Sequence, residues 1–215
     1  MRQDARRSGE AAPAAAQPDA PPGNFVRLAE VAPQIAQDMR YAGCENFLGR
    51  PVPGYRSAQC WLRREAAHAL AAAAQEAAAM GLSFVVYDGY RPQRATRAFL
   101  AWAQDPRDVA RKADYYPRLD KADLFELGYI ARQSSHSTGA AVDLSIVGLD
   151  FGSPFDLFDP VSGADWPHLP DEARRNRALL RGLMERAGFA PLAQEWWHFS
   201  LSALDGAPAH DFEAP

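Results

Sequence analysis

The sequence has no apolar run that approaches the roughly 18 residues needed to cross a bilayer. It also has no cluster of Lys and Arg of the kind that follows a nucleic-acid backbone, and its net charge is −4. We therefore expect neither a membrane span nor a nucleic-acid partner. An apolar content of 47% and a charged content of 23% are ordinary for a globular protein, and 215 residues are enough for one substantial domain.

Cysteine is scarce. Cys44 and Cys60 are the only two, and they do not form a C-x-x-C pair, which argues against a cysteine-rich zinc site. We favour two free thiols. The alternative is one disulfide that closes a short loop, which would indicate an oxidising compartment.

Large apolar residues are missing from positions 11–22. Residues 11–22 are Ala, Pro, Gln and Asp alone, a composition that predicts a disordered extension at 1–22 and a folded domain at 23–215. Arg2, Arg6 and Arg7 are basic, but the apolar stretch of a secretory signal does not follow them. We therefore expect a cytoplasmic location, with a periplasmic one as the alternative if a signal peptide has been removed.

Hydrophobic periodicity predicts a single α+β domain. Apolar residues at helical spacing indicate two long helices, and runs of β-branched and aromatic residues indicate three strands. We expect a small, mainly antiparallel sheet with the helices packed against it. The predicted strands are 82–88, 141–147 and 196–201, and the predicted long helices are 61–80 and 171–187.

An imidazole and a carboxylate lie seven positions apart in the stretch 134–143, Ser-Ser-His-Ser-Thr-Gly-Ala-Ala-Val-Asp. Val142 and Leu144 flank Asp143, so the carboxylate points away from the apolar face of the predicted strand. A charge in such a run is costly unless it is solvated, paired or bound to a cation. The preceding loop can bring His136 beside Asp143, and nitrogen and oxygen ligands suit Zn²⁺. The alternative is an Asp143 that backbone N–H groups satisfy.

A catalytic zinc site takes three protein ligands and leaves a fourth position for water. His198 is the best candidate for the third ligand, because its bulky, strand-like segment can lie beside the Asp143 strand. Glu195 precedes it by three residues and can serve as base and then acid in hydrolysis. A regular strand would put Glu195 and His198 on opposite faces, so Glu195 must precede the regular strand or lie at a bulge. Alternatively, Glu195 is a fourth ligand that closes the site.

Arg91 lies at the corner between a predicted strand and a helix that Pro92 opens. Amide hydrolysis builds negative charge on the carbonyl oxygen, and a fixed guanidinium can stabilise it. The alternative is a structural ion pair between Arg91 and Asp88. Further along, three aspartates lie among phenylalanines and could receive a cation, although we expect two of the three to cap turns. They are Asp150, Asp156 and Asp159.

Three segments of the chain follow one another in a specific order. They are 87–95 (Tyr-Asp-Gly-Tyr-Arg-Pro-Gln-Arg-Ala), 134–143, and 195–199 (Glu-Trp-Trp-His-Phe). Together they resemble the D-alanyl-D-alanine dipeptidases of the vancomycin-resistance type. The similarity extends from about residue 38 to about residue 201, which is most of the chain.

The resemblance implies both a fold and an activity. The fold is the α+β fold of the D,D-peptidases and hedgehog domains. The activity is hydrolysis of D-alanyl-D-alanine, or of a close D,D-dipeptide, with one zinc ion per chain. By motif, the implied zinc ligands are His136, Asp143 and His198, the implied general base and acid is Glu195, and the implied oxyanion stabiliser is Arg91.

The resemblance further implies a small substrate pocket. Its contacts would come from four polar side chains, one of which, Asp156, is a suitable counter-ion for the free ammonium of a dipeptide. The four are Tyr41, Tyr55, Ser135 and Asp156.

Two other functions remain open at this point. One is a zinc D,D-carboxypeptidase that acts on peptidoglycan stem peptides, and the other is a non-catalytic zinc-binding module. The presence of Glu195 and Arg91 argues against the second, because binding alone needs neither side chain.

Overall fold

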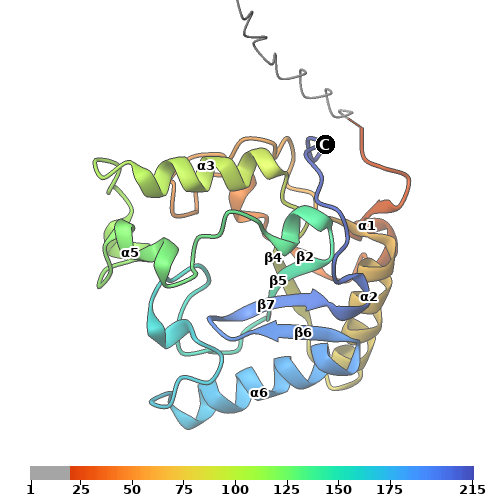
Figure 1. Ribbon diagram of the computed structural model, residues 1–215. Coiled ribbons are helices and arrows are strands. Elements are labelled where there is room, and N and C mark those ends of the chain that lie inside the picture. The colour runs from red at the N-terminus through yellow and green to blue at the C-terminus, as the bar shows by residue number, and fades with distance from the viewer. Residues whose placement is uncertain (1–19) are drawn as a thin grey trace, which may run out of the picture.

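A five-stranded sheet runs through the middle of the computed structural model, which describes residues 20–215 (Figure 1). The strand order is β2-β4-β5-β7-β6, and only the β2–β4 pair is parallel. The three predicted strands are the central three, so the mainly antiparallel α+β fold is confirmed. The strands are β2 (Ala36–Gln37), β4 (Phe84–Asp88), β5 (Ala141–Ile146), β6 (Phe189–Leu192) and β7 (Glu195–Leu201). Most of the predicted disordered extension, residues 1–19, lies outside the described residues.

The two long helices, α2 (Arg64–Ala79) and α6 (Asp171–Arg186), pack against each other beside the sheet (Figure 1). The helix predicted at 61–80 is wrong at its start, because Trp61–Arg63 forms β3 and pairs with β1 (Phe25–Arg27) in a small second sheet. The partner strand is distant in the sequence, so periodicity alone cannot reveal this pairing. The remaining helices are α1 (Leu28–Val31), α3 (Gln93–Gln104), α4 (Lys112–Tyr115) and α5 (Lys121–Glu126), with 3₁₀ turns η1 (Arg40–Ala42), η2 (Ser135–Thr138), η3 (Pro160–Ser162) and η4 (Ser202–Leu204).

β5 is the central strand, and all six of its residues are buried. Val142, Leu144 and Ile146 join the main core together with apolar residues of α2 and α6. Asp143 and Ser145 alternate with them and therefore face the other side of the sheet. That side is covered too, so Asp143 is not solvated and needs a partner.

A β-bulge aligns three polar residues across the centre of the sheet. Up to Val86, β4 pairs regularly with β5, but the register then shifts so that Asp88 lies opposite Asp143. Asp143 in turn lies opposite His198 of β7. Directly opposed residues of an antiparallel pair share a face. The bulge therefore brings Asp88 out of the apolar alternation of β4 and into a polar row with Asp143 and His198.

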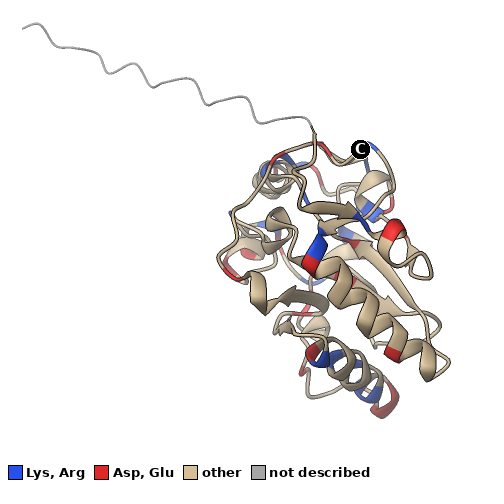
Figure 2. Cartoon of the chain, turned by 90° about the vertical axis from the view of Figure 1, so that its right-hand side faces the viewer, with Lys and Arg blue, Asp and Glu red and all other residues tan. Residues whose placement is uncertain are grey.

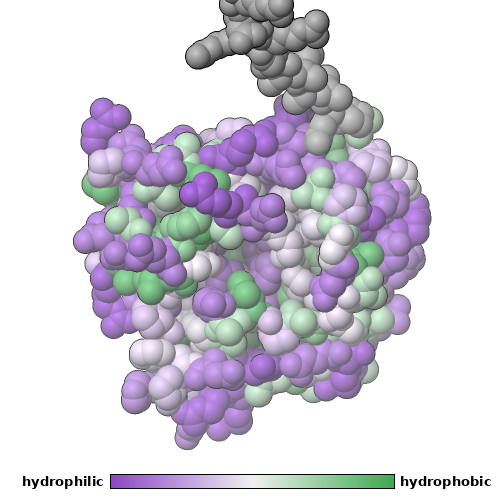
Figure 3. All heavy atoms as spheres, viewed as in Figure 1, coloured by the Kyte–Doolittle hydropathy of each residue, from purple (hydrophilic) through white to green (hydrophobic). Residues whose placement is uncertain are grey.

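Three further properties of the described residues concern charge and membrane spans, exposed apolar side chains, and the two cysteines. Acidic and basic residues are interspersed over the described chain (Figure 2), and no helix among residues 20–215 is long and apolar enough to span a membrane. Exposed apolar side chains gather near α5 (Figure 3), where Phe125 and Leu127 are 42% and 47% exposed. Cys44 is exposed and Cys60 is buried, and both thiols are free, as the favoured prediction has it.

Candidate active site

His136 is held in one orientation by the turn that precedes β5. Ser134 caps η2 by accepting the N–H of His136, and Gly139 ends the turn in the left-handed region, with a φ of 75°. The Nδ1 atom of His136 lies 2.7 Å from the carbonyl oxygen of Gly89. A carbonyl only accepts hydrogen bonds, so Nδ1 carries the proton and Nε2 presents a lone pair.

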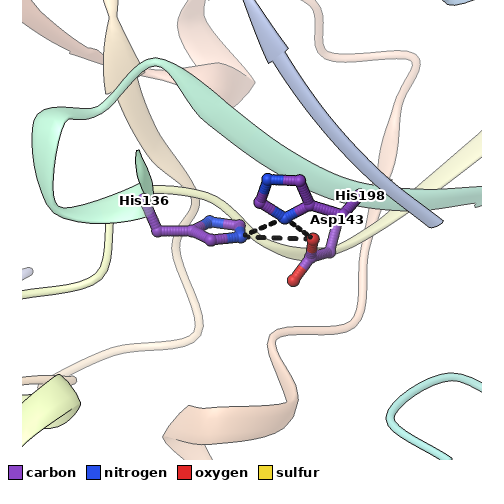
Figure 4. A group of neighbouring side chains, drawn as sticks. All are labelled: His136, Asp143 and His198. Carbon is purple, nitrogen blue, oxygen red and sulfur yellow. Dashed lines mark hydrogen bonds and ion pairs between the residues drawn. The ribbon is translucent and has the colours of Figure 1, made fainter. Parts of the chain in front are cut away.

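Three ligand atoms converge at one point beside the central strand, as Figure 4 shows. Nε2 of His136 lies 3.2 Å from Oδ1 of Asp143 and 3.0 Å from Nδ1 of His198, and the latter two atoms are 3.0 Å apart. A lone pair, a carboxylate and a second imidazole nitrogen repel one another unless a proton or a metal ion lies among them. Ligands bound tetrahedrally at about 2.0–2.1 Å would lie about 3.3 Å apart, so this donor set fits a zinc-sized ion. Among residues 20–215 it is the only cluster of at least three His, Cys, Asp or Glu residues that could hold a metal ion.

Glu195 begins β7 at a second irregularity of the sheet. Pro191 pairs with Phe199, whereas the next residue, Leu192, pairs with Glu195. This register shift lets Glu195 and His198 line the same cavity despite their three-residue spacing, and of the two predicted alternatives Glu195 lies at an irregularity of the strand. Burial, reinforced by the charge of Asp143, raises the pKa of Glu195 to about 7 in the metal-free protein.

Arg91 is fixed at the corner between β4 and α3. Its Nε and an Nη each lie 2.9 Å from Oδ2 of Asp88, and that Nη is 3.7 Å from Oδ2 of Asp143. The guanidinium also stacks over the rings of Tyr41 and Phe99, at 5.1 and 5.0 Å from their centroids. Arg91 therefore forms the predicted ion pair with Asp88 and also lines the cavity, and its role as oxyanion stabiliser stays a prediction.

A cavity of about 230 Å³ opens beside these residues. Three of the four predicted substrate contacts, Tyr41, Ser135 and Asp156, line it, whereas the lining does not include Tyr55. The hydroxyl of Tyr41 lies 3.0 and 2.9 Å from the two oxygens of Asp156 and donates to this carboxylate. Burial, reinforced by the charge of Asp143, raises the pKa of Asp156 well above its ordinary value.

Asp156 is also distinguished by its backbone. Its φ of 62° is the only positive value among the described non-glycine residues. The other two aspartates of this region cap turns: Asp150 accepts the N–H of Gly152, and Asp159 accepts the N–H of Val161 and pairs with Arg118. The prediction that two of the three cap turns is confirmed, and Asp156 is the one that faces the cavity.

Comparison with known proteins agrees with this geometry. The family model described as D-ala-D-ala dipeptidase, of the M15 peptidases, matches residues 22–211. The chain is 40% identical to a D-alanyl-D-alanine dipeptidase of Streptomyces coelicolor, over 83% of this chain and 92% of that one. It is 39% identical to a D-alanyl-D-alanine dipeptidase of Enterococcus faecalis, over 82% and 91% of the two chains.

The chain belongs to the D-alanyl-D-alanine dipeptidase family. The resemblance drawn from the three sequence segments is thereby confirmed. Among solved structures, the chain is similar to a mutant of the vancomycin-resistance D,D-pentapeptidase VanY in complex with Zn(II), with a TM-score of 0.42 and 18% identity over 66% of this chain and 72% of that one. The latter likeness is partial.

In this member of the dipeptidase family, Asp88 makes more contacts at the site than the sequence pattern predicts. This carboxylate is fully buried, and it accepts hydrogen bonds from Tyr55 at 2.7 Å, from the N–H of Gly89 at 2.9 Å and from Arg91. Nδ1 of His136 lies 3.6 Å from it. Asp88 thus connects Arg91 to the cluster of candidate metal ligands. A signal was present in the sequence, because alternation with Phe84 and Val86 would place a carboxylate on an apolar face unless a bulge intervened.

Proposed function

We propose that this chain is a zinc-dependent dipeptidase that hydrolyses D-alanyl-D-alanine or a close D,D-dipeptide. The observation that carries the proposal is the convergence of His136, Asp143 and His198 on one point, at a cavity that also contains Glu195 and Arg91. The names of the relatives supply the substrate class. When bound by these three side chains, zinc would polarise the scissile carbonyl and acidify a water molecule.

Glu195 would move the protons of the reaction. As a carboxylate it takes a proton from the attacking water, and as the acid so formed it protonates the leaving amine. A general base works best when its pKa lies near the working pH, and burial sets the pKa of Glu195 near neutrality in the metal-free protein. The bulge at the start of β7 places this carboxylate on the cavity side together with His198.

Arg91 would stabilise the negative charge that develops on the carbonyl oxygen. Its guanidinium is already oriented by Asp88 and by the rings of Tyr41 and Phe99, so little reorganisation is needed during the reaction. Tyr55 holds Asp88 in turn. We propose that Tyr55 acts through Asp88 and Arg91 rather than by touching the substrate.

Asp156 and Ser135 would orient the dipeptide. A protonated Asp156 cannot attract an ammonium strongly, but an arriving ammonium favours the ionised carboxylate, and the Tyr41 hydroxyl supports that form. Ser135 lines the same cavity and adjoins His136. A cavity of about 230 Å³ with a buried carboxylate suits a small substrate that carries a free amino group.

Glu195→Ala tests the mechanism. We expect the variant to bind zinc with an affinity close to that of the unmodified protein and to lose D-alanyl-D-alanine hydrolysis, because Glu195 handles protons and is not a ligand. Glu185→Ala is the matched control, since it removes an exposed carboxylate of α6 that pairs with Arg181. Hydrolysis that persists in Glu195→Ala would overturn the assignment.

A substrate panel separates the dipeptidase from a D,D-carboxypeptidase. The dipeptidase should cleave D-alanyl-D-alanine and should discriminate strongly against the N-acylated peptide, which lacks the ammonium that Asp156 would bind. Rapid cleavage of the acylated peptide would favour the carboxypeptidase. Zinc binding with no hydrolysis of D,D-, L,D- or L,L-dipeptides would favour a non-catalytic module.

A further inference from the structure

We infer that Ser135 and Ser200 together anchor His198, by accepting the proton of its Nε2 and so aiming its Nδ1 at the metal position. Ser200 lies two residues after His198 on the same face of β7, and Ser135 precedes His136 in η2. The two hydroxyls therefore come from two different elements that each also supply a candidate ligand. The inference deepens the proposed function and rests on it, because it takes zinc as the ion.

The three polar atoms form a triangle on the far side of the His198 ring. Nε2 of His198 lies 3.2 Å from Oγ of Ser135 and 3.2 Å from Oγ of Ser200, and the two hydroxyl oxygens are 3.1 Å apart. On the near side, Nδ1 of His198 faces the other two candidate ligand atoms at 3.0 Å. One ring nitrogen thus points at the metal position and the other at the serine pair.

The proton count of the ring fixes the direction of these bonds. A neutral imidazole carries one N–H, and a nitrogen that binds a metal must present its lone pair. With Nδ1 toward the metal, Nε2 carries the proton and needs an acceptor. The serine oxygens are the only such acceptors for Nε2 among the hydrogen bonds of residues 20–215, so they satisfy the N–H of the tautomer that a metal on Nδ1 requires.

The same proton count leaves the O–H of Ser135 without an acceptor among these three polar atoms. The hydroxyl of Ser200 donates to Oγ of Ser135, and the N–H of His198 also donates into the pair. Neither partner then accepts the proton of Ser135. Because Ser135 lines the catalytic cavity, its O–H is available to a bound substrate. Ser135 would therefore both anchor a ligand and touch substrate, whereas Ser200 is a positioning residue alone.

Two acceptors for one N–H predict a non-additive effect on zinc affinity. Ser135→Ala and Ser200→Ala each leave one hydroxyl within reach of Nε2, so each single variant should lose less than about fivefold. The double variant leaves the N–H unpaired on a buried ring, and loss of an outer-shell partner costs about 10–100-fold in metal affinity. The two serines should differ in catalysis, because Ser135→Ala should raise KM for D-alanyl-D-alanine and Ser200→Ala should leave it within about twofold.

The experiment is a competition titration of Zn²⁺ against a chromophoric chelator, with the full chain, four serine-pair variants and one control variant. Ser145→Ala is the control, since this β5 hydroxyl lies on the same face of the sheet but bonds Tyr87 at 2.8 Å, and the variant should bind zinc normally. The fourth variant, Ser135→Ala with Ser200→Thr, keeps one hydroxyl and should behave like Ser135→Ala. Side-chain ¹⁵N NMR of the zinc-loaded protein should show the proton of His198 on Nε2.

The outcomes separate this inference from the proposed function. A double variant that binds zinc as tightly as the unmodified protein overturns the anchor and leaves the dipeptidase proposal standing. A His198 proton on Nδ1 in the zinc-loaded protein overturns the anchor and also removes Nδ1 of His198 from the proposed ligand set. Normal zinc binding without D,D-dipeptide hydrolysis overturns the proposed substrate, while the affinity series still decides the anchor. A chain that binds no zinc overturns both.

Discussion

Two aspartates near the cavity are equally buried and behave in opposite ways. Asp143 and Asp156 are 2% and 4% exposed. Burial alone would raise the pKa of Asp143, but its interactions with the imidazoles of His136 and His198 outweigh burial and lower that pKa. Asp156 has a neutral partner, Tyr41, and burial raises its pKa. The partner, and not the depth of burial, decides whether a carboxylate is ionised in the folded protein.

This difference suggests that the two carboxylates bind different cations. Asp143 lies among nitrogen ligand atoms and suits a resident cation, whereas burial beside a neutral partner favours the neutral form of Asp156 until a cation arrives. We propose that the resident cation is zinc and that the arriving one is the ammonium of the dipeptide. Exchanging each carboxylate for an amide should therefore damage different measured properties.

Asp143→Asn should produce the largest effect. It replaces the anionic ligand with a weak neutral one and leaves the two imidazoles in place. Changes outside the ligand shell cost about 10–100-fold in metal affinity, so losing a ligand should cost more than about 100-fold. Competition titration measures the affinity, and hydrolysis at limiting zinc should fall in parallel. Unchanged zinc affinity would remove Asp143 from the ligand set.

Asp156→Asn should leave zinc affinity intact and raise KM for the dipeptide. Hydrogen bonds to charged groups contribute about 1.5–3 kcal/mol, which corresponds to roughly 10–150-fold in KM. Steady-state kinetics over pH 6–9 measures the change. In the unmodified protein KM should fall as pH rises through the raised pKa of Asp156, because only the ionised form attracts the ammonium. A variant that loses zinc instead would contradict the assignment of Asp143 to the metal and of Asp156 to the substrate.

The segment around Asp143 could be predicted from the sequence because its pattern is local. Val142 and Leu144 fix the face of the strand, and a glycine-containing turn brings His136, seven positions earlier, close to Asp143. Asp88 could not be assigned in the same way, since its orientation depends on a bulge that forms only when β4 pairs with β5. β3 was missed for the same reason, because its partner β1 is distant in the sequence.

The resemblance identified candidate substrate contacts that the local sequence pattern does not reveal, but it did not predict where their side chains lie. Tyr41 and Tyr55 both entered as substrate contacts. The structure puts Tyr41 on the cavity, beside Asp156, and Tyr55 on Asp88. The two tyrosines have the same chemistry and their ring centroids lie 5.8 Å apart, so only the three-dimensional position of their hydroxyls distinguishes them.

Glu195→Gln should change the pH dependence of stability in the metal-free protein. A carboxyl whose pKa rises from 4.5 to about 7 on folding stabilises the folded state fully below pH 4.5, and this contribution is lost as pH rises through 7. Each pH unit between these values contributes up to about 1.4 kcal/mol, and partial exposure of Glu195 reduces the total to about 2 kcal/mol. Chemical denaturation should therefore show Glu195→Gln gaining stability relative to the unmodified protein from pH 5 to pH 8. Parallel curves would contradict the raised pKa.

Tyr41→Phe should produce the smallest effect. The ring still packs in the aromatic cluster, and only the hydroxyl that donates to Asp156 is lost. One hydrogen bond of about 1 kcal/mol corresponds to roughly fivefold in KM. Since this bond favours the ionised carboxylate, its loss should also move the pH dependence of KM upward. Zinc affinity should not change, and a change would link Tyr41 to the metal ligands instead.

The most direct test of the two-carboxylate account is a crystal structure of the Glu195→Ala protein grown with Zn²⁺ and D-alanyl-D-alanine, with anomalous data at the zinc edge. The account predicts one zinc within about 2.0–2.2 Å of Nε2 of His136, Nδ1 of His198 and a carboxylate oxygen of Asp143. It also predicts the dipeptide ammonium within hydrogen-bond distance of Asp156. An anomalous peak elsewhere, or an ammonium that contacts neither oxygen of Asp156, would contradict it.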